Sequence, residues 1–527
     1  MHMKERVRDL EQRRAAKRAM GGPARLERQK KKGKLDARAR LQLLFDSNRF
    51  EEFGLLAASE GKLADEEPPD QPTPADGVIT GIGEIEGRPV AVAAYDFTVL
   101  GGSIGEVGER KVARLRDLAL KNRIPIVWLV DSAGARLDAS SEIDPRRIAS
   151  FADTGYLFRE QVVMSGVVPQ VAAMVGPGAA GTAYIPGLAD FVPMVRGTSS
   201  MAIGGPYLVE SVIGEKVSEE ELGGSKVHTQ LSGTADAEYP DDAACIAGIR
   251  EYLSFFPSHC EEKPPFRTTD DPTDRRDEEL LSVVPENPRR AFDMHKVILP
   301  ILDQRHFFPL KPNFARNLIT GLGRIGGYPI GVVANNSIFL GGVLDVNASD
   351  KAARFINLCD AFGIPLLFLQ DVPGFMVGTQ VEQQGIIRHG AKMLYAVASA
   401  TVPKFTVVVR KGYGAGYYVM NGRAYEPDLL VAWPGAEIGI MGPDGLVAIA
   451  ARKILQSAGD ANAQQVKKGE LVKALRERID IYRAAALGML DDIIDPRDTR
   501  ASIGRALRRT LNKKVERPYR RREISPV

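Results

Sequence analysis

Apolar runs separated by helix-forming segments divide most of this chain into alternating strands and helices. Uninterrupted apolar runs at residues 126–130 and 366–369 predict buried strands. Longer segments with helical composition at 109–122, 350–363 and 385–400 predict helices beside them. Because strands alternate with helices, the pattern predicts an α/β fold with parallel pairing between strands.

The predicted elements occur twice in the same order, at a nearly constant distance along the chain. The segment ITGIGEIEGRPVAV at 79–92 matches ITGLGRIGGYPIGV at 319–332, an offset of 240 residues. Each copy starts with a hairpin-like strand pair and a Gly-Gly turn, and ends with a strand that enters a glycine turn. The same offset relates two further pairs: Lys111 with Lys351, and Asp131 with Asp371. The chain therefore contains two homologous domains in tandem.

The first 76 residues differ in composition from the two repeats. Residues 1–40 hold 15 Lys or Arg against 5 Asp or Glu, and an acidic, proline-rich stretch follows. Two interpretations of this basic segment stay open: a solvated helix outside the fold, or a basic edge that meets a polyphosphate. We predict a basic helical extension and linker at 1–76, a first domain at 77–265 and a second domain at 266–527.

Each repeat also contains an apolar run that enters a turn of small residues. The run at 406–409 leads to three glycines at 412, 414 and 416, and the run at 170–175 leads to a similar turn at 176–181. A turn between a strand and a helix leaves N–H groups unpaired at the helix N-terminus, where they suit a phosphate or a developing oxyanion. The alternative is that these glycines only allow a helix to pack closely on a strand. Two copies in matching contexts favour a functional role, and an offset of 235 pairs Ala180-Gly181 with Ala415-Gly416.

Charge and cysteine content exclude several classes of protein. The net charge is +3, from 70 basic and 67 acidic residues, so the chain as a whole has no electrostatic signature for nucleic acid. Three cysteines without a C-x-x-C pair exclude a zinc ribbon and a disulfide scaffold, and fit a reducing compartment. There is no H-E-x-x-H motif, and we expect no metal site.

Targeting and membrane signals are also missing from the sequence. The N-terminus has no apolar core of a secretory signal, which favours a cytoplasmic location. The uncharged stretch at 161–189 is long enough to span a bilayer, but its prolines and glycines favour a buried strand, turn and helix. We therefore expect no membrane partner.

Three short motifs suggest functions that the neighbouring sequence or the repeat partner argues against. The G-x-G-x-x-G at 321–326 precedes a β-branched run where a dinucleotide-binding unit requires a helix. The G-x-S-x-G at 101–105 resembles a hydrolase nucleophile turn, but its repeat partner has Val343 in place of Ser103. The tripeptide at 391–393 is part of the A-M-K-M biotin attachment site, without the Met before Lys392, so biotin is not expected on this chain.

Several motifs together resemble the carboxyltransferase β subunits of biotin-dependent acyl-CoA carboxylases, of the propionyl-CoA and methylcrotonyl-CoA carboxylase type. The likeness runs from about residue 35 to the end of the chain. Besides the two glycine turns, the motifs that carry it are DVPGF at 371–375, IIRHGAK at 386–392, LDVNASDKAARF at 344–355, AWPGAEI at 432–438, ELGG at 221–224, His228 and LSGTAD at 231–236. By itself, His228 is more simply a hydrogen-bonded structural histidine.

The resemblance implies an architecture and a set of partners. The fold would be two crotonase-like (ClpP/crotonase) domains built from ββα superhelical units. The protein would act as a homohexamer with a biotin carboxylase/biotin carboxyl carrier α subunit, which carries the biotin. Its substrate would be a coenzyme A thioester, propionyl-CoA or a related short acyl-CoA.

The resemblance also implies a mechanism, carboxyl transfer from carboxybiotin to the acyl-CoA without a nucleophilic side chain. The first turn, Ala180 and Gly181, would donate N–H groups to the thioester oxygen, and the second, Ala415 and Gly416, to the biotin ureido oxygen. The first turn reads G-P-G-A-A-G where many relatives show G-P-C-A-G-G. The expected substrate-binding residues are Gly178, Ala179, Tyr184, Gly414, Tyr417 and Tyr418.

Three questions stay open at this level. Tyr418 is either a wall of the acyl pocket or a packed helix residue remote from the substrate. The motifs divide between the propionyl and the methylcrotonyl type. A carboxyltransferase subunit of a sodium-pumping acyl-CoA decarboxylase, or a non-catalytic relative, would share the same pair of domains.

Overall fold

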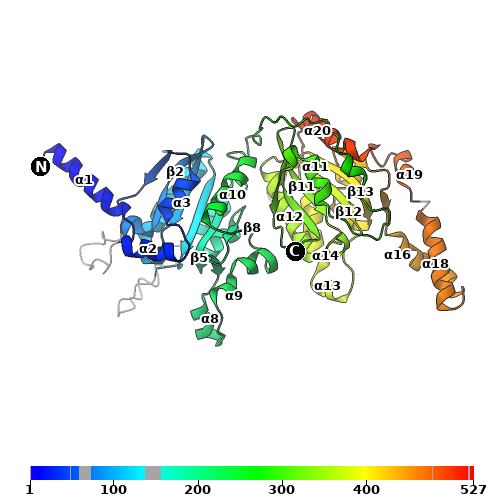
Figure 1. The fold of residues 1–527 in the computed structure, drawn as a ribbon, viewed down its shortest axis with the longest axis horizontal. Coiled ribbons are helices and arrows are strands. Elements are labelled where there is room, and N and C mark those ends of the chain that lie inside the picture. The colour runs from blue at the N-terminus through cyan, green and yellow to red at the C-terminus, as the bar shows by residue number, and fades with distance from the viewer. Residues whose placement is uncertain are drawn as a thin grey trace. The chain divides into compact units, whose positions relative to one another are not determined.

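The computed structural model describes residues 2–47, 49–58, 73–136, 156–476, 479–519, 521 and 523–526 (Figure 1). The chain divides into two compact units, Met1–Lys263 and Pro264–Val527. Most of the predicted acidic linker lies outside the described residues. Both units have the predicted α/β architecture, and the same arrangement of elements occurs in each.

The first unit is built on an 8-stranded sheet in the order β1-β2-β3-β4-β5-β6-β8, with β7 pairing on β5. The pairs β1/β2 and β2/β3 are antiparallel, and the pairs from β3 onward are parallel. Its strands are β1 (Phe50–Phe53), β2 (Val78–Ile85), β3 (Arg88–Tyr95), β4 (Ile126–Ser132), β5 (Gln170–Ala179), β6 (Pro193–Val195), β7 (Ser200–Ala202) and β8 (Ala237–Tyr239).

Helices complete the first unit. They are α1 (Met3–Arg18), α2 (Pro23–Lys31), α3 (Ala37–Leu44), α4 (Glu106–Asn122), α6 (Tyr156–Met164), α7 (Gly181–Leu188), α8 (Pro206–Ile213), α9 (Glu219–Gly223) and α10 (Asp242–Phe255), with a π-helical turn at Val227–Leu231. The apolar face of α4 packs with β4 and β5 in one core, which includes Val112, Leu115 and Trp128. The predicted helix at 109–122 and strand at 126–130 lie inside α4 and β4.

The second unit repeats this plan on an 8-stranded sheet in the order β16-β14-β13-β12-β11-β10-β9, with β15 pairing on β13. Its strands are β9 (Phe307–Leu310), β10 (Leu318–Ile325), β11 (Tyr328–Asn335), β12 (Leu366–Val372), β13 (Lys404–Tyr413), β14 (Leu429–Ala432), β15 (Glu437–Gly439) and β16 (Asp492–Ile493). All residues of β12 are buried, as expected for a strand covered on both faces.

The helices of the second unit are α11 (His295–Ile301), α12 (Val346–Ala361), α13 (Thr379–Gln383), α14 (Ile386–Ser399), α15 (Gly414–Val419), α16 (Pro443–Ala450), α17 (Arg452–Gln456), α18 (Ala461–Arg476), α19 (Ile481–Ala486) and α20 (Thr499–Thr510). Helices α16 to α18 extend away from the sheet (Figure 1) and have a small core of their own, Val447, Ala451 and Val472. The predicted helices at 350–363 and 385–400 correspond to α12 and α14.

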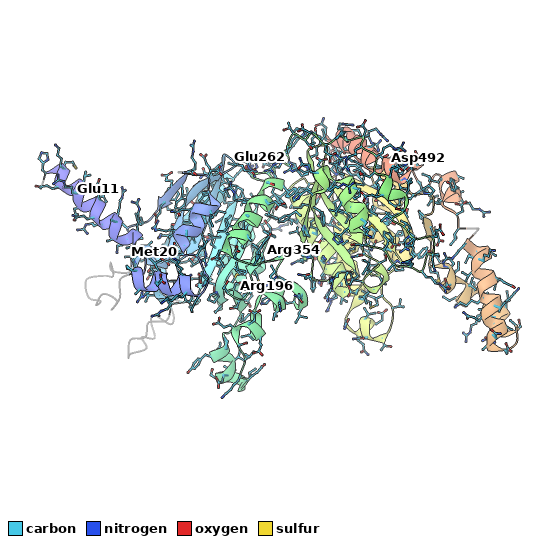
Figure 2. The ribbon with its side chains drawn as sticks, in the orientation of Figure 1. Glu11, Met20, Arg196, Glu262, Arg354 and Asp492 are labelled. Atoms are coloured by element: carbon cyan, nitrogen blue, oxygen red, sulfur yellow. The ribbon has the colours of Figure 1, made fainter. Side chains whose placement is uncertain are left out.

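The N-terminal helices differ from one another in burial. Helix α1, which carries Glu11, has no buried residue (Figure 2), in agreement with a solvated helix. Helix α3 buries Ala37, Leu41 and Leu44 in the first unit, and β1 adds a strand to its sheet. Helix α3 and strand β1, both before position 77, are therefore part of the first unit's structure.

Candidate active site

The strand register places the two glycine turns at an offset of 234 residues. Ser132 pairs with Gly178 between β4 and β5, and Val372, 240 residues after Ser132, pairs with Gly412 between β12 and β13. Gly178 therefore corresponds to Gly412, and Ala180 to Gly414. The offset of 235 inferred from the sequence is wrong by one residue, because small residues occupy adjacent positions in both turns and only the pairing fixes the register.

The backbone conformation of the first turn supports this correspondence. Ala180, between β5 and α7, has φ 53° and ψ −121°, a region that is essentially reserved for glycine. Gly414, at the equivalent position, has φ 56°. Both turns therefore have a positive φ at the equivalent position, which is occupied by alanine in the first unit and by glycine in the second.

The amide groups that follow Ala180 are the available donors of the first turn. The Ala180 N–H donates to the Ala202 carbonyl of β7 at 3.1 Å, so it is already paired. The Gly181 and Thr182 N–H groups open α7 and have no acceptor among the residues that the structure describes. Ala180 is exposed and Gly181 is half-buried, so the turn is accessible to a ligand.

In the second turn, Ala415 is exposed and Gly416 is buried. Their N–H groups lie in the first turn of α15, and within the described ranges neither has an acceptor. A Cβ at Gly416 would lie 2.7 Å from Val372 Cγ2 and 3.0 Å from Gly374 Cα. The close-packing interpretation therefore holds for Gly416. A Cβ at Gly181 meets only Phe158 Cζ, at an ordinary 3.6 Å.

The corrected register brings out a pair of tyrosines that the sequence offset had hidden. Tyr184 and Tyr418 are equivalent at 234, each four residues beyond the left-handed position, and their exposed fractions are 49% and 47%. The ring of Tyr184 packs edge-on against Phe158 at 5.6 Å. Tyr417 is only 8% exposed, and its hydroxyl oxygen accepts the Arg423 N–H at 3.0 Å. A half-exposed tyrosine thus stands beside each turn.

Glu437 is paired beside the second turn. The Tyr413 hydroxyl, at the N-cap of α15, donates to Glu437. Arg476 Nη1 lies 3.3 Å from the other oxygen of Glu437. Burial and the neighbouring carboxylate raise the pKa of Tyr413, so the phenol stays protonated. Glu437 lies in the motif at 432–438, which gave no indication of a role for this residue; its hydrogen bond supports Tyr413, the N-cap of α15.

His228 is a hydrogen-bonded structural histidine. Its Nε2 lies 2.8 Å from the Met201 carbonyl, which only accepts, so Nε2 carries the proton. Nδ1 then accepts from the Ser232 hydroxyl at 2.8 Å. Burial lowers the pKa of His228, in agreement with a neutral ring. Met201 precedes Ala202, the residue that holds the Ala180 amide, so His228 supports the strand behind the first turn.

The repeated lysines are structural. Lys111 Nζ donates to the Ala75 and Val78 carbonyls at 2.7 and 2.6 Å. Lys351 Nζ donates to four carbonyls, including those of Phe314 at 2.8 Å and Leu318 at 2.6 Å. Burial lowers the pKa of Lys351 to about 7. Both lysines tie a helix to the segment that enters the first strand of the repeat.

A basic pocket of about 280 Å³ lies in the first unit, between α2 and the turn after β3. Its lining includes Arg25, Arg28 and Lys32 on one side and Phe97 and Thr98 on the other. The turn contacts the residue after β4 through a backbone hydrogen bond from the Ala133 N–H to the Gly101 carbonyl, at 2.8 Å, and Ser132 at the end of β4 pairs with Gly178 of β5. Three cations on one wall suit an anionic ligand.

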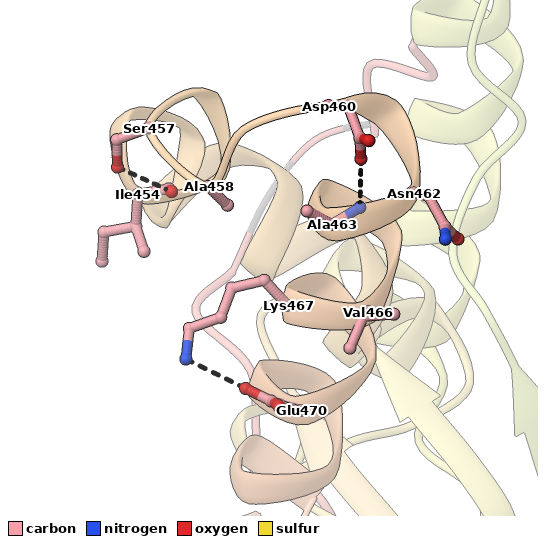
Figure 3. Close-up of a pocket in the computed structure, with 9 residues that line it drawn as sticks. All are labelled: Ile454, Ser457, Ala458, Asp460, Asn462, Ala463, Val466, Lys467 and Glu470. Carbon is pink, nitrogen blue, oxygen red and sulfur yellow. Dashed lines mark hydrogen bonds and ion pairs between the residues drawn. The ribbon is translucent and has the colours of Figure 1, made fainter.

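A second cavity, of about 710 Å³, lies between α17 and α18 (Figure 3). The charged side chains at its wall bond within the wall itself: Lys467 pairs with Glu470 at 2.9 Å, and Asp460 caps the Ala463 N–H at 2.8 Å. We assign it no role in the site. In the part of the chain described, no group of metal-ligating side chains was found, and no helix has the length and apolar character to cross a membrane.

Comparisons with known proteins agree on one family. The family model described as the carboxyl transferase domain matches residues 28–524. The propionyl-CoA carboxylase beta chain of Roseobacter denitrificans is 41% identical over the full length of both chains. The methylmalonyl-CoA decarboxylase subunit alpha of Veillonella parvula is 40% identical, over 100% of this chain and 99% of that protein. The crystal structure of transcarboxylase 12S, described as a hexamer with methylmalonyl-coenzyme A bound, superposes with a TM-score of 0.92 at 40% identity, over 100% of this chain and 99% of that one.

Proposed function

Because the chain belongs to the carboxyl transferase family, we propose that it transfers the carboxyl group of carboxybiotin, held by a partner chain, to a short acyl-CoA. It is a carboxyltransferase of the propionyl-CoA carboxylase type with two crotonase-like domains, as the sequence motifs had indicated. The observation that carries the proposal is the pair of equivalent turns, each with amide groups that lack an acceptor in the described part of the protein.

The reaction requires the stabilisation of negative charge on two oxygens, and amide groups suit this task. In the first unit, we propose that the Gly181 and Thr182 N–H groups hold the thioester oxygen as the enolate forms; Ala180, expected from the sequence as a donor with Gly181, already donates its N–H to Ala202. In the second unit, the Ala415 and Gly416 N–H groups fit a ureido oxygen. Loss of one such donor in other enzymes costs roughly 2.7 to 4 kcal/mol of transition-state stabilisation. Biotin supplies the carboxyl group and the base, so no base is assigned to this chain.

Side chains and glycines beside the turns define the proposed substrate contacts. Tyr184 and Tyr418 are the side chains we propose to face substrate, because both are half-exposed at equivalent positions. We propose that Ala179 and Gly414 leave room for the ligand to approach the backbone, whereas Gly178 is buried and a Cβ there would lie 2.5 Å from Met174 Cε. Tyr417 is buried, and we propose that it supports the second turn through the Arg423 amide.

The basic pocket supports the polyphosphate interpretation of the N-terminal segment. Coenzyme A carries phosphate groups at the end remote from the thioester, and two cations are exposed here, Arg28 on α2 and Lys32 directly after it. The pocket lies in the unit whose turn we assign to the thioester. We propose that these cations bind the phosphates of the coenzyme A moiety.

Assembly and location follow the same reasoning. We propose a homohexamer that works with a biotin carboxylase/biotin carboxyl carrier α subunit in the cytoplasm, supported by the likeness to transcarboxylase 12S. A methylcrotonyl-CoA preference is less favoured than a propionyl-CoA preference, because propionyl-CoA carboxylase β chains are among the relatives of similar length. A carboxyltransferase of a sodium-pumping decarboxylase is the second candidate, supported by the relative from Veillonella parvula. Copurification with a biotin carboxylase rather than a membrane subunit discriminates between them.

The test is a carboxylation assay with the chain reconstituted with its biotin-bearing partner. Rates are measured across a panel of acetyl-, propionyl-, butyryl- and methylcrotonyl-CoA, with the chain alone as the control. We expect the highest kcat/KM with propionyl-CoA, and no covalent biotin on this chain in an avidin blot. Absence of carboxylation with every member of the panel would refute the proposal.

A further inference from the structure

Each repeat buries an aspartate at the carboxyl end of the strand that pairs with the one entering its glycine turn. Asp131 in β4 and Asp371 in β12 are equivalent, and both are fully buried. In the second unit, Arg410 of β13 binds Asp371 through two hydrogen bonds, Nε to Oδ1 at 2.9 Å and Nη2 to Oδ2 at 2.6 Å. The strand that enters the second turn therefore supplies the counter-ion itself.

The first unit has no such arginine in its strand. At the offset of 234, the residue equivalent to Arg410 is Gly176. A Cβ there would lie 1.9 Å from Asp131 Oδ1 and 2.7 Å from Lys34 Nζ. Gly176 thus leaves the space in which a cation from elsewhere in the chain meets Asp131.

The N-terminal segment supplies that cation. Lys34 Nζ lies 2.6 Å from Asp131 Oδ1, and Arg40 Nη1 lies 2.9 Å from Oδ2. Gln29 Nε2 also donates to Oδ2, at 2.9 Å. Asp242, 3.3 Å from Arg40, completes a buried group of two cations and two anions. Because removal of one partner leaves a buried charge uncompensated, residues 29–40 are bound firmly to the sheet.

Arg40 also contacts β5, the strand that enters the first turn. Arg40 Nη2 donates to the Val175 carbonyl of β5 at 2.8 Å, five residues before Ala180. Gly134, three residues after Asp131, lies so close to the turn that a Cβ there would be 2.8 Å from the Ala179 carbonyl oxygen. Displacement of Arg40 or Asp131 would therefore shift both sides of the turn.

We propose that Lys34 and Arg40 are positioning residues for the first turn, and that they hold it as Arg410 holds the second. The N-terminal segment is then part of the half of the enzyme that activates the acyl-CoA. The proposal rests on the function proposed for that turn, and it gives the basic segment a role that neither open interpretation of its sequence had included.

The test is a double-mutant cycle of Lys34→Ala and Gly176→Arg, in the full chain reconstituted with its biotin-bearing partner. Lys34→Ala is expected to lower kcat/KM for the acyl-CoA by about 100-fold, the scale of a ~1 Å misplacement of a reacting geometry. Its KM for the carboxylated partner should stay near the parent value. Gly176→Arg alone is expected to lower the Tm, because its side chain meets Lys34 and Asp131. In the double variant, Asp131 can rotate to the orientation of Asp371, and both Tm and kcat/KM should exceed those of either single variant.

Specific outcomes would overturn the proposal. One is a folded Lys34→Ala protein with the parent kcat/KM for acyl-CoA. Another is a double variant that regains Tm without regaining kcat/KM. Where Lys34→Ala does not fold, Arg40→Lys decides: it keeps the charge but not the second donor to Val175, and we expect it to fold with kcat/KM lowered about ten-fold. An unchanged kcat/KM in that variant also overturns the proposal. Failure of the proposed function is distinct, because the parent protein itself would then carboxylate no acyl-CoA.

Discussion

Replacing Ala180 with glycine should stabilise the first unit, although the turn it belongs to is assigned to catalysis. At φ 53° and ψ −121°, an L-residue with a Cβ is strained by about 1–3 kcal/mol, and glycine is not. Glycine also increases the conformational entropy of the unfolded chain, which lowers the free energy of unfolding by about 0.4–1 kcal/mol. The difference favours Ala180→Gly by about 1 kcal/mol in the free energy of unfolding.

Ala415→Gly is the matched control, and it should have the opposite sign. The sequence offset of 235 made Ala415 the partner of Ala180, but the structural register assigns that place to Gly414. Ala415 has an ordinary negative φ in α15. Glycine in a helix costs about 0.5–1 kcal/mol relative to alanine, so Ala415→Gly should destabilise the second unit.

The assay is thermal unfolding of the purified chain, with hydrogen exchange of the β5–α7 and β13–α15 peptides to assign each effect to its unit. For a domain of this size, 1 kcal/mol corresponds to a shift in Tm of roughly 2–4 °C. We expect an increase for Ala180→Gly and a decrease for Ala415→Gly. A decrease for Ala180→Gly, or equal shifts of the same sign in both variants, would refute the structural register and the strain assigned to Ala180.

Three further predictions concern neighbouring residues. Gly416→Ala should reduce carboxyl transfer and Tm together, because its Cβ meets Val372 and Gly374, whereas Gly181→Ala should retain the parent Tm; equal Tm values would contradict this. His228 has a lowered pKa when folded, so the unfolded chain takes up its proton first as the pH falls below 6.5 and stability is lost there. Urea titrations at several pH values should show this loss in the parent and not in His228→Gln. Tyr184→Ala and Tyr418→Ala should change the ratio of kcat/KM between short and branched acyl-CoAs by roughly ten-fold; a uniform loss across the panel would instead indicate a packing defect.

Strands and helices of the core could be predicted from the sequence because their burial follows local patterns. Residues 126–130 and 366–369 are apolar without interruption, and they lie in fully buried strands. The tandem repeat was equally readable, since identical motifs recur at one offset. These features depend only on residue type and spacing along the chain.

The register of the turns and the role of the N-terminal segment could not be predicted in this way. A shift of one residue between two small-residue turns leaves the pattern of sizes almost unchanged, and strand pairing is needed to detect it. The sequence predicted Gly176 to be a turn glycine, but it lies within β5 and makes room for Lys34. Lys34 and Arg40 belong to the basic segment, for which the sequence left open a solvated helix or a basic edge that meets a polyphosphate, and nothing near them in the sequence indicates a buried carboxylate.

The two counter-ion arrangements have different consequences for folding order. In the second unit, Asp371 and Arg410 are 39 residues apart, so the pair can form once two neighbouring strands meet. In the first unit, the partner of Lys34 lies 97 residues later in the chain. The Leu35 N–H donates to Asp242, which lies 207 residues later. Contacts of such long sequence separation slow folding, because the loop they close must be ordered first. The ion pair that supports the first turn is therefore expected to form later in the folding of its unit than the pair that supports the second turn, and Lys34 has no access to this partner until β4 has been synthesised.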